Sequence, residues 1–195
     1  LINFGDTAVI KHFMTAEDVG IYNVAYKSFN TIADFAYVIS SYFAANISSY
    51  FAKKDTRSIK RFFYRDRFLI IVLSLIAHIV VMIFSKPIIT TLFGDRYADS
   101  VSIFIVLMVG SMIRYASVFY MLYFNTNGKH KIQQIINIFR AILNFILDII
   151  FINIFGLIGP AIATTVAILI TFVISALYCE NRILKLANDE VKTID

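Results

Sequence analysis

An all-α membrane protein is the fold class that this sequence predicts, and three observations predict it. Of the 195 residues, 59% are hydrophobic and 16% are charged, and the mean hydropathy is +0.75, which lies outside the usual range of soluble domains. The apolar residues form long runs, and a run of about 18 residues can cross a hydrocarbon layer of ~30 Å as a helix. The alternating pattern that a membrane β-barrel requires does not occur.

The apolar runs predict six transmembrane helices, of which the first is truncated. The expected helices are 1–14, 20–52, 68–84, 100–124, 132–155 and 159–179. The first begins at Leu1, with neither an initiator Met nor basic residues before it, so we expect a fragment of a longer chain and no signal peptide. We therefore expect residues 1–180 to form a six-helix transmembrane lobe and residues 181–195 to form a tail.

Basic residues cluster in alternate connections between these helices. Segments 53–67 and 125–131 hold seven and two Lys or Arg residues, and the tail holds three, whereas the other connections hold only Lys86 and Arg96. Basic residues close to a membrane segment stay on the cytoplasmic side, so we expect a cytoplasmic C-terminus. The net charge of +5 then follows from topology and from attraction to anionic lipids, and no nucleic-acid partner is needed.

Polar residues inside the predicted helices follow two stripes. At 100° per residue, one face of 132–155 collects, within about 60° of arc, Gln133, Asn137, Arg140, Asn144 and Asp148. A second stripe on 20–52 consists of Asn23, Lys27, Asn30, Asp34, Tyr37, Ser41 and Ser48. Polar side chains can also simply join helices by hydrogen bonds. Two stripes that carry charges of both signs favour a shared aqueous cavity.

Charged residues within the predicted helices are the strongest functional signal, because each costs at least ~2.5 kcal/mol at the bilayer centre. The residues that we expect to line a substrate path are Lys27, Asn30, Asp34, Arg114, Asn137, Arg140, Asn144 and Asp148. The candidates for binding a coupling ion are Asp6, Asp34 and Asp148. Arg140 has an alternative, because its long side chain can snorkel to the cytoplasmic interface.

Sequence motifs of enzymes are absent, including a Walker loop, HExxH, a nucleophile elbow and spaced Cys or His clusters. We therefore expect no catalytic residue, no metal site and no cofactor. His78 stands alone in an aliphatic run and is expected to be packed or hydrogen-bonded, and Cys179 has no partner for an intrachain disulfide. Pro87 and Gly94 delimit a short apolar turn within 85–97, which predicts an interfacial helix at the outer surface.

A resemblance to the Wzx-type O-antigen flippases is carried by three segments: EDVGIYNVAYKSF (17–29), KPIITTLFGDRYADSVSIFIVL (86–107) and FGLIGPAIATTVA (155–167). They occur in the family's order and spacing. These flippases belong to the multidrug/oligosaccharidyl-lipid/polysaccharide (MOP) superfamily, in which two six-helix lobes surround a central cavity. The resemblance implies that this chain is the C-terminal lobe and that an N-terminal lobe of similar length is missing.

The resemblance further implies an activity and partners. The whole protein would translocate an undecaprenyl-pyrophosphate-linked oligosaccharide across the bacterial cytoplasmic (inner) membrane, for O-antigen or capsule synthesis. The implied partners are this lipid-linked oligosaccharide, membrane lipids and the missing N-terminal lobe of the same chain, with a polysaccharide polymerase as a further candidate.

The polar residues fit such a substrate. A glycan needs hydrogen-bond partners to cross hydrocarbon and a pyrophosphate needs cations, for which Arg140, Arg114 and Lys27 are available. Two alternatives stay open. One is an ion-coupled multidrug or metabolite antiporter, which would favour acidic cavity residues. The other is a non-transporting membrane scaffold of glycan assembly, which would not need charges at mid-membrane.

Overall fold

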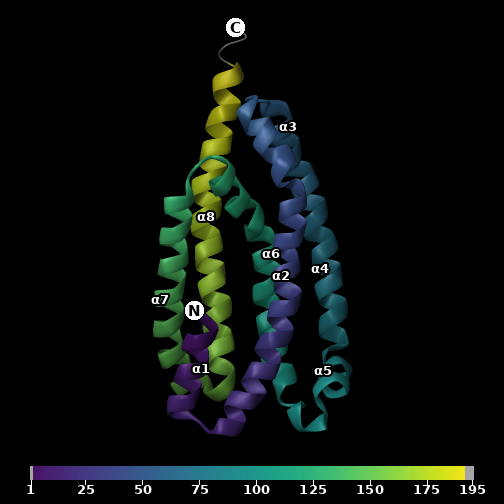
Figure 1. Cartoon of the computed structure of the whole chain (residues 1–195), viewed down its shortest axis with the longest axis vertical. Coiled ribbons are helices and arrows are strands. Elements are labelled where there is room, and N and C mark those ends of the chain that lie inside the picture. Colours follow the sequence, from purple (N-terminus) through teal and green to yellow (C-terminus); the bar gives the residue numbers. More distant parts are fainter. Residues whose placement is uncertain (1, 192–195) are drawn as a thin grey trace.

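Eight α-helices make up most of the chain that the structure describes (Figure 1). The computed structural model describes residues 2–191, and the side-chain surroundings of residues 5–183. The helices are α1 (Ile2–Phe13), α2 (Ala16–Ala52), α3 (Thr56–Arg61), α4 (Arg67–Ile83), α5 (Ser85–Phe93), α6 (Ser100–Thr126), α7 (His130–Phe155) and α8 (Gly159–Val191). A π-helical segment, Phe62–Asp66, joins α3 to α4, and the described residues contain no strand. The predicted all-α class is confirmed.

The six predicted membrane helices correspond to α1, α2, α4, α6, α7 and α8. Most ends agree within a few residues, and α5 occupies the segment expected to form an interfacial helix. The largest difference is at the end of α8, which continues to Val191 although the apolar run predicts an end at 179. A helix needs no apolar residues once it leaves the bilayer, so it can extend beyond its membrane span. Residues 192–195 of the expected tail lie outside the described residues.

By length and composition, three described stretches are apolar enough to cross a membrane, namely Thr56–Ile83, Ser100–Thr126 and His130–Ile183. The last stretch contains all of α7 and most of α8. The 12 described residues of α1 are too few to span ~30 Å at ~1.5 Å per residue. α2 is long enough but carries the polar stripe along its length. This pattern is that of a multi-pass membrane protein.

α6 is the central helix of the bundle. It packs against α2 on one side and α8 on the other, α7 packs against α8, and α1 contacts both α2 and α7 (Figure 1). Gly110 permits close packing of α6 on α8, because an added Cβ would lie 3.1 Å from Thr165 Oγ1. Small residues at helix crossings are typical of membrane bundles, where close packing replaces the hydrophobic effect as the driving force.

Two hydrophobic cores lie one beyond the other along the bundle. The first contains Ile10, Tyr22, Phe29, Phe104, Leu107 and Met108, together with other residues of α1, α2, α5, α6, α7 and α8. The second is centred on Ile47, Phe63, Phe119, Phe124 and Ile183. On α6 the first core reaches Met108 and the second begins at Tyr115, so Arg114 lies where the two cores meet.

Polar contacts join the helices outside these cores. Glu180 of α8 accepts hydrogen bonds from Arg67 Nη2 at 2.9 Å and from the Tyr120 hydroxyl at 2.7 Å, which ties α4, α6 and α8 together. His78 of α4 is buried, with Nδ1 2.7 Å from the Ser74 carbonyl oxygen and Nε2 2.8 Å from Ser111 Oγ on α6. The prediction that His78 is hydrogen-bonded is confirmed.

Candidate functional site

Two carboxyl groups are buried where α1, α2, α7 and α8 converge. Asp6 and Asp148 are both 0% exposed, and Asn144 between them is 2% exposed. Asn144 Nδ2 donates to Asp6 Oδ1 at 2.8 Å and to Asp148 Oδ2 at 2.9 Å. Asp6 Oδ2 also accepts from the hydroxyls of Tyr22, at 2.6 Å, and Thr164, at 3.2 Å. We call these five residues the carboxyl cluster.

The carboxyl cluster assembles because of helix periodicity and the position of α1. Asn144 and Asp148 are four residues apart on α7, so they lie one above the other on the same face. That face meets α1, which carries Asp6, while α2 supplies Tyr22 and α8 supplies Thr164. The residues that join across the cluster are up to 158 positions apart in the sequence.

The carboxyl cluster lacks a compensating positive charge. Among the described residues, neither Asp6 nor Asp148 has a basic side chain within ion-pair distance, and Asp148 Oδ1 and Asn144 Oδ1 have no hydrogen-bond partner. Two buried carboxylates without compensation are very costly, so the cluster needs a bound cation or a proton. The described residues contain no group of three or more His, Cys, Asp or Glu side chains that could hold a metal.

Two arginine side chains line a small cavity next to the carboxyl cluster. The cavity has a volume of about 20 Å³, and its walls are formed by Tyr26, Phe29, Arg114, Arg140, Asn144, Thr164 and Ile168. The guanidinium carbon of Arg114 lies 5.8 Å from the ring centre of Phe29 and 5.5 Å from that of Tyr37, so two aromatic faces hold it. We call Arg114 and Arg140 the arginine pair.

The arginine pair has hydrogen-bond donors to spare. Arg114 Nε and Nη1 and Arg140 Nε are buried and have no hydrogen-bond partner within the part of the chain that the structure describes. Arg114 Nη1 is 3.8 Å from Asp34 Oδ1, which is within ion-pair range but too long for a hydrogen bond. Asp34 is mostly exposed, with 65% of its side chain accessible, so its charge compensates that of Arg114 only weakly. Buried N–H donors without partners on two half-buried arginine side chains suit an oxyanion.

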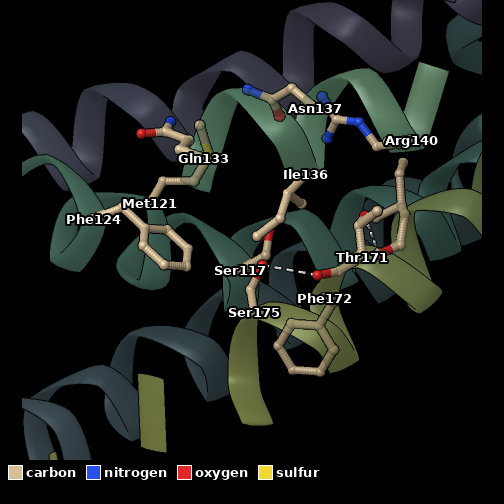
Figure 2. A pocket seen from close by; sticks show the side chains of 11 residues that line it. Ser117, Met121, Phe124, Gln133, Ile136, Asn137, Arg140, Thr171, Phe172 and Ser175 are labelled. Carbon is tan, nitrogen blue, oxygen red and sulfur yellow. Dashed lines mark hydrogen bonds between the residues drawn. The ribbon is translucent and has the colours of Figure 1, made fainter. Parts of the chain in front are cut away.

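A second cavity of about 30 Å³ adjoins the first and shares Arg140 and Ile168 with it. Figure 2 shows Gln133, Asn137 and Arg140 in a row along α7. Ile136 of α7 also lines the cavity, and residues of α6 and α8 complete its walls, including Ser117, Met121, Phe124, Thr171, Phe172 and Ser175. A cavity of this volume with polar walls is large enough to hold water molecules. The polar stripe of α7 thus lines both cavities and ends in the carboxyl cluster.

The candidate residues that the sequence suggests divide into two groups. Asn137 and Arg140 are half-buried beside the cavities, and Asn144 and Asp148 are buried with Asp6. On α2, Lys27 and Asp34 are exposed and Asn30 is half-buried. The structure brings Arg114 and Arg140 to one cavity. Arg140 contributes to the walls of both cavities.

Several residues of the site were not predicted from the sequence. Tyr22 and Thr164 bind Asp6, and Tyr26 and Phe29 line the arginine cavity. Their residue types are common in membrane helices, and no periodic signal separates them from ordinary packing residues. Only the contacts between helices identify them.

The sequence profile of the family described as "Polysaccharide biosynthesis protein" matches residues 1–102, just over half of the chain. The chain belongs to this family. The match covers α1 to α5, including Asp6, and ends at the start of α6, before Arg114, Arg140 and Asp148.

Two comparisons cover nearly all of this polysaccharide biosynthesis protein. The probable low-salt glycan biosynthesis flippase Agl15 of Haloferax volcanii is 22% identical over 173 residues, which cover 89% of this chain and 37% of Agl15. A solved MOP superfamily transporter from Pyrococcus furiosus has a TM-score of 0.76 at 17% identity, covering 91% of this chain and 40% of that one. The chain therefore shares its fold with part of a MOP transporter and spans about two fifths of the length of both proteins.

Proposed function

We propose that this chain is the C-terminal lobe of a flippase that moves an undecaprenyl-pyrophosphate-linked oligosaccharide across the bacterial cytoplasmic membrane for surface polysaccharide synthesis. The observation that carries the proposal is the arginine pair, whose buried N–H donors lack partners within the described residues. The family of the chain and the flippase Agl15 among its relatives support the glycan as cargo.

The arginine pair suits the pyrophosphate group of such a substrate. A pyrophosphate diester carries two negative charges and several acceptor oxygens, and a planar guanidinium group can donate two parallel hydrogen bonds to a phosphate. Asn137 and Gln133, beyond Arg140 on α7, add amide groups that can bind sugar hydroxyls. On α2, Lys27, Asn30 and Asp34 supply polar groups on an exposed face that the N-terminal lobe would cover.

The carboxyl cluster is the proposed site of the coupling ion. Among the described residues, no basic side chain pairs with the buried Asp6 and Asp148, so binding or release of one positive charge there strongly changes the electrostatic energy of the site. Asp34 is a weaker candidate, because it is exposed and already lies near Arg114. Residues 1–180 would form the lobe, with 181–195 as a cytoplasmic tail, and a polysaccharide polymerase would take over the exported product.

The proposed substrate is preferred to the cationic cargo of a multidrug antiporter for one structural reason. The groups that line the cavities are basic, whereas the carboxyl groups lie behind Asn144. A cationic drug would meet the arginine pair first, and that contact is repulsive. A scaffold without transport activity would gain nothing from two guanidinium groups with free donors at mid-membrane.

The proposal can be tested with the full-length protein in a strain that lacks its own flippase. Arg140→Ala should lower the amount of surface polysaccharide at least about tenfold, since a desolvated charged hydrogen bond contributes about 1.5–3 kcal/mol. Arg140→Lys should recover little, because an ammonium group lacks the planar fork. Arg96→Ala, on the exposed connection after α5, is the matched control. Wild-type amounts from Arg140→Ala at equal protein levels would show that the arginine serves packing only.

A further inference from the structure

We propose that a row of exposed basic residues on segment 53–67 binds the phosphate groups of anionic phospholipids, at the end of the bundle where α8 ends (Figure 1). The row consists of Lys53, Lys54, Arg57, Arg61 and Arg65, and we call it the basic row. None of its members lines either cavity, so the basic row is separate from the proposed substrate path.

Positive charge is concentrated in segment 53–67. Its seven basic and two acidic residues give it a net charge of +5, as large as that of the whole chain. Arg67 is bound to Glu180, but among the described residues no member of the basic row forms an ion pair. The carboxylate of Asp55 instead accepts a hydrogen bond from the backbone N–H of Ser58 at 3.0 Å. The described part of the chain thus leaves five exposed positive charges together, and these attract an anionic surface.

One face of α3 and of the π-helical segment is anchored in the protein. The buried residues of this face are Thr56, Ile59, Phe62 and Phe63. Arg57, Arg61 and Arg65 are exposed and follow one another at intervals of four residues, about one helical turn, so they lie close to one line. Arg67 then ties the end of the segment to Glu180 of α8. A row of bases on an anchored helix keeps its shape without a ligand, which lowers the entropy cost of binding.

The backbone at Lys54 is a second sign that positive charge has a use on this surface. Lys54 has a φ of 53°, in the left-handed region that residues other than glycine seldom adopt. In the part of the chain that the structure describes, the other residues with positive φ are all glycines. A glycine at position 54 would fit this turn more easily, so the presence of a lysine favours a role for its charged side chain.

The apolar surface next to the basic row favours a phospholipid over a soluble anion. Within about one helical turn of Arg65, Phe68 and Leu69 are 65% and 59% exposed, and they begin an apolar run that is long enough to cross a membrane. Tyr64 is also exposed, and tyrosine is common at the boundary between acyl chains and headgroups. A phospholipid can place its phosphate at the basic row and its acyl chains along α4. A soluble anion would use the bases alone.

The test is native mass spectrometry of the purified, delipidated full-length protein, titrated in detergent with phosphatidylglycerol or with phosphatidylcholine of the same acyl chains. The wild type should bind phosphatidylglycerol at least about tenfold more tightly, because only this lipid carries a net negative charge. Arg57→Gln combined with Arg61→Gln should remove most of this preference, since each base near an anionic surface changes binding about fivefold. Excess inorganic phosphate should not displace the bound phosphatidylglycerol.

Lys86→Gln combined with Arg96→Gln is the matched control, because it removes two exposed bases from α5 and the connection after it, at the opposite end of the bundle (Figure 1). This control should keep the wild-type preference, and so should Arg140→Ala, which alters the proposed substrate site. Lys54→Gly should weaken the preference about fivefold. It should leave thermal stability in detergent near that of the wild type, because glycine suits this turn. Lys54→Gly therefore decides the matter even if the double variant fails to fold.

Equal binding of the two lipids by the wild type would overturn the inference, and so would an unchanged preference in Lys54→Gly and the double variant. Loss of the preference in Arg140→Ala would assign the lipid phosphate to the arginine pair and would also overturn it. Displacement of phosphatidylglycerol by inorganic phosphate would show a site for free anions, which contradicts a membrane lipid as the ligand.

Discussion

The polar stripes of α7 and α2 contain similar residues but differ in their surroundings. On α7, the stripe from Gln133 to Asp148 lines two cavities and ends in a buried hydrogen-bonded cluster. On α2, Lys27 and Asp34 are exposed, and Asp34 has only a long ion pair with Arg114. Buried polar groups in a membrane need partners within the protein, whereas exposed ones need water or another protein surface. The difference indicates that this chain completes the α7 side of its site by itself and leaves the α2 side open.

The largest expected effect concerns the α2 stripe as a whole. Residues 1–195 expressed alone should support no export in a flippase-null strain, because one lobe leaves the exposed polar face of α2 against lipid. Export should return when the remainder of the full-length protein is supplied in the same cell. Surface polysaccharide measured by immunoblot distinguishes the cases. Export by these 195 residues alone would mean that a second copy of the chain covers the polar face of α2, or that this face needs no covering.

A matched pair of substitutions compares one carboxyl group from each stripe. Asp148→Asn should lower the export rate about tenfold or more, since it removes one of the two buried carboxyl groups of the proposed coupling-ion site. Asp34→Asn should lower it less than about threefold, because an exposed and poorly aligned ion pair contributes little. Both substitutions preserve side-chain size, and rates are compared at equal protein levels. Equal losses of export rate in Asp148→Asn and Asp34→Asn would mean that burial does not determine which stripe matters for export.

The smallest effect is expected at the start of α2, outside the predicted membrane span. Thr15 caps the helix, and the carboxylate of Asp18 accepts from the Thr15 hydroxyl at 2.7 Å and from its backbone N–H at 2.9 Å. These hydrogen bonds lower the pKa of Asp18 below its ordinary value. A lowered pKa in the folded state means that this stabilisation is present at neutral pH and is lost as the pH falls through that pKa.

Thr15→Ala should therefore destabilise the full-length protein by no more than about 1 kcal/mol at pH 7, reduced by solvent exposure. The loss should shrink below about pH 4, where Asp18 in the wild type takes up its proton. Thermal unfolding in detergent between pH 7 and about pH 4 measures this loss of stability. Thr31→Ala is the control, because Thr31 is an exposed residue within α2. A loss of stability that does not depend on pH would mean that the carboxylate of Asp18 does not stabilise this turn.

The apolar pattern predicted the helices well because each span must present apolar side chains to lipid, and α4 agrees with its predicted range within a residue or two. The pattern could not place the end of α8, since helix formation continues where hydropathy falls. Asn144 and Asp148 could be placed on one face from their spacing alone. Their contacts with Asp6 and Thr164 join residues far apart in sequence, and helix periodicity carries no information about which helices meet.

Flipping by the purified full-length protein in liposomes tests the central claim most directly. A labelled undecaprenyl-pyrophosphate-linked oligosaccharide is incorporated in the membrane, and an impermeant glycosidase reports how fast the glycan moves between leaflets. The account predicts movement with the wild-type protein, a rate at least about tenfold lower with Arg140→Ala, and a near wild-type rate with Arg96→Ala. Equal movement with wild type and Arg140→Ala, both faster than in protein-free liposomes, would contradict the claim that the arginine pair carries the pyrophosphate group.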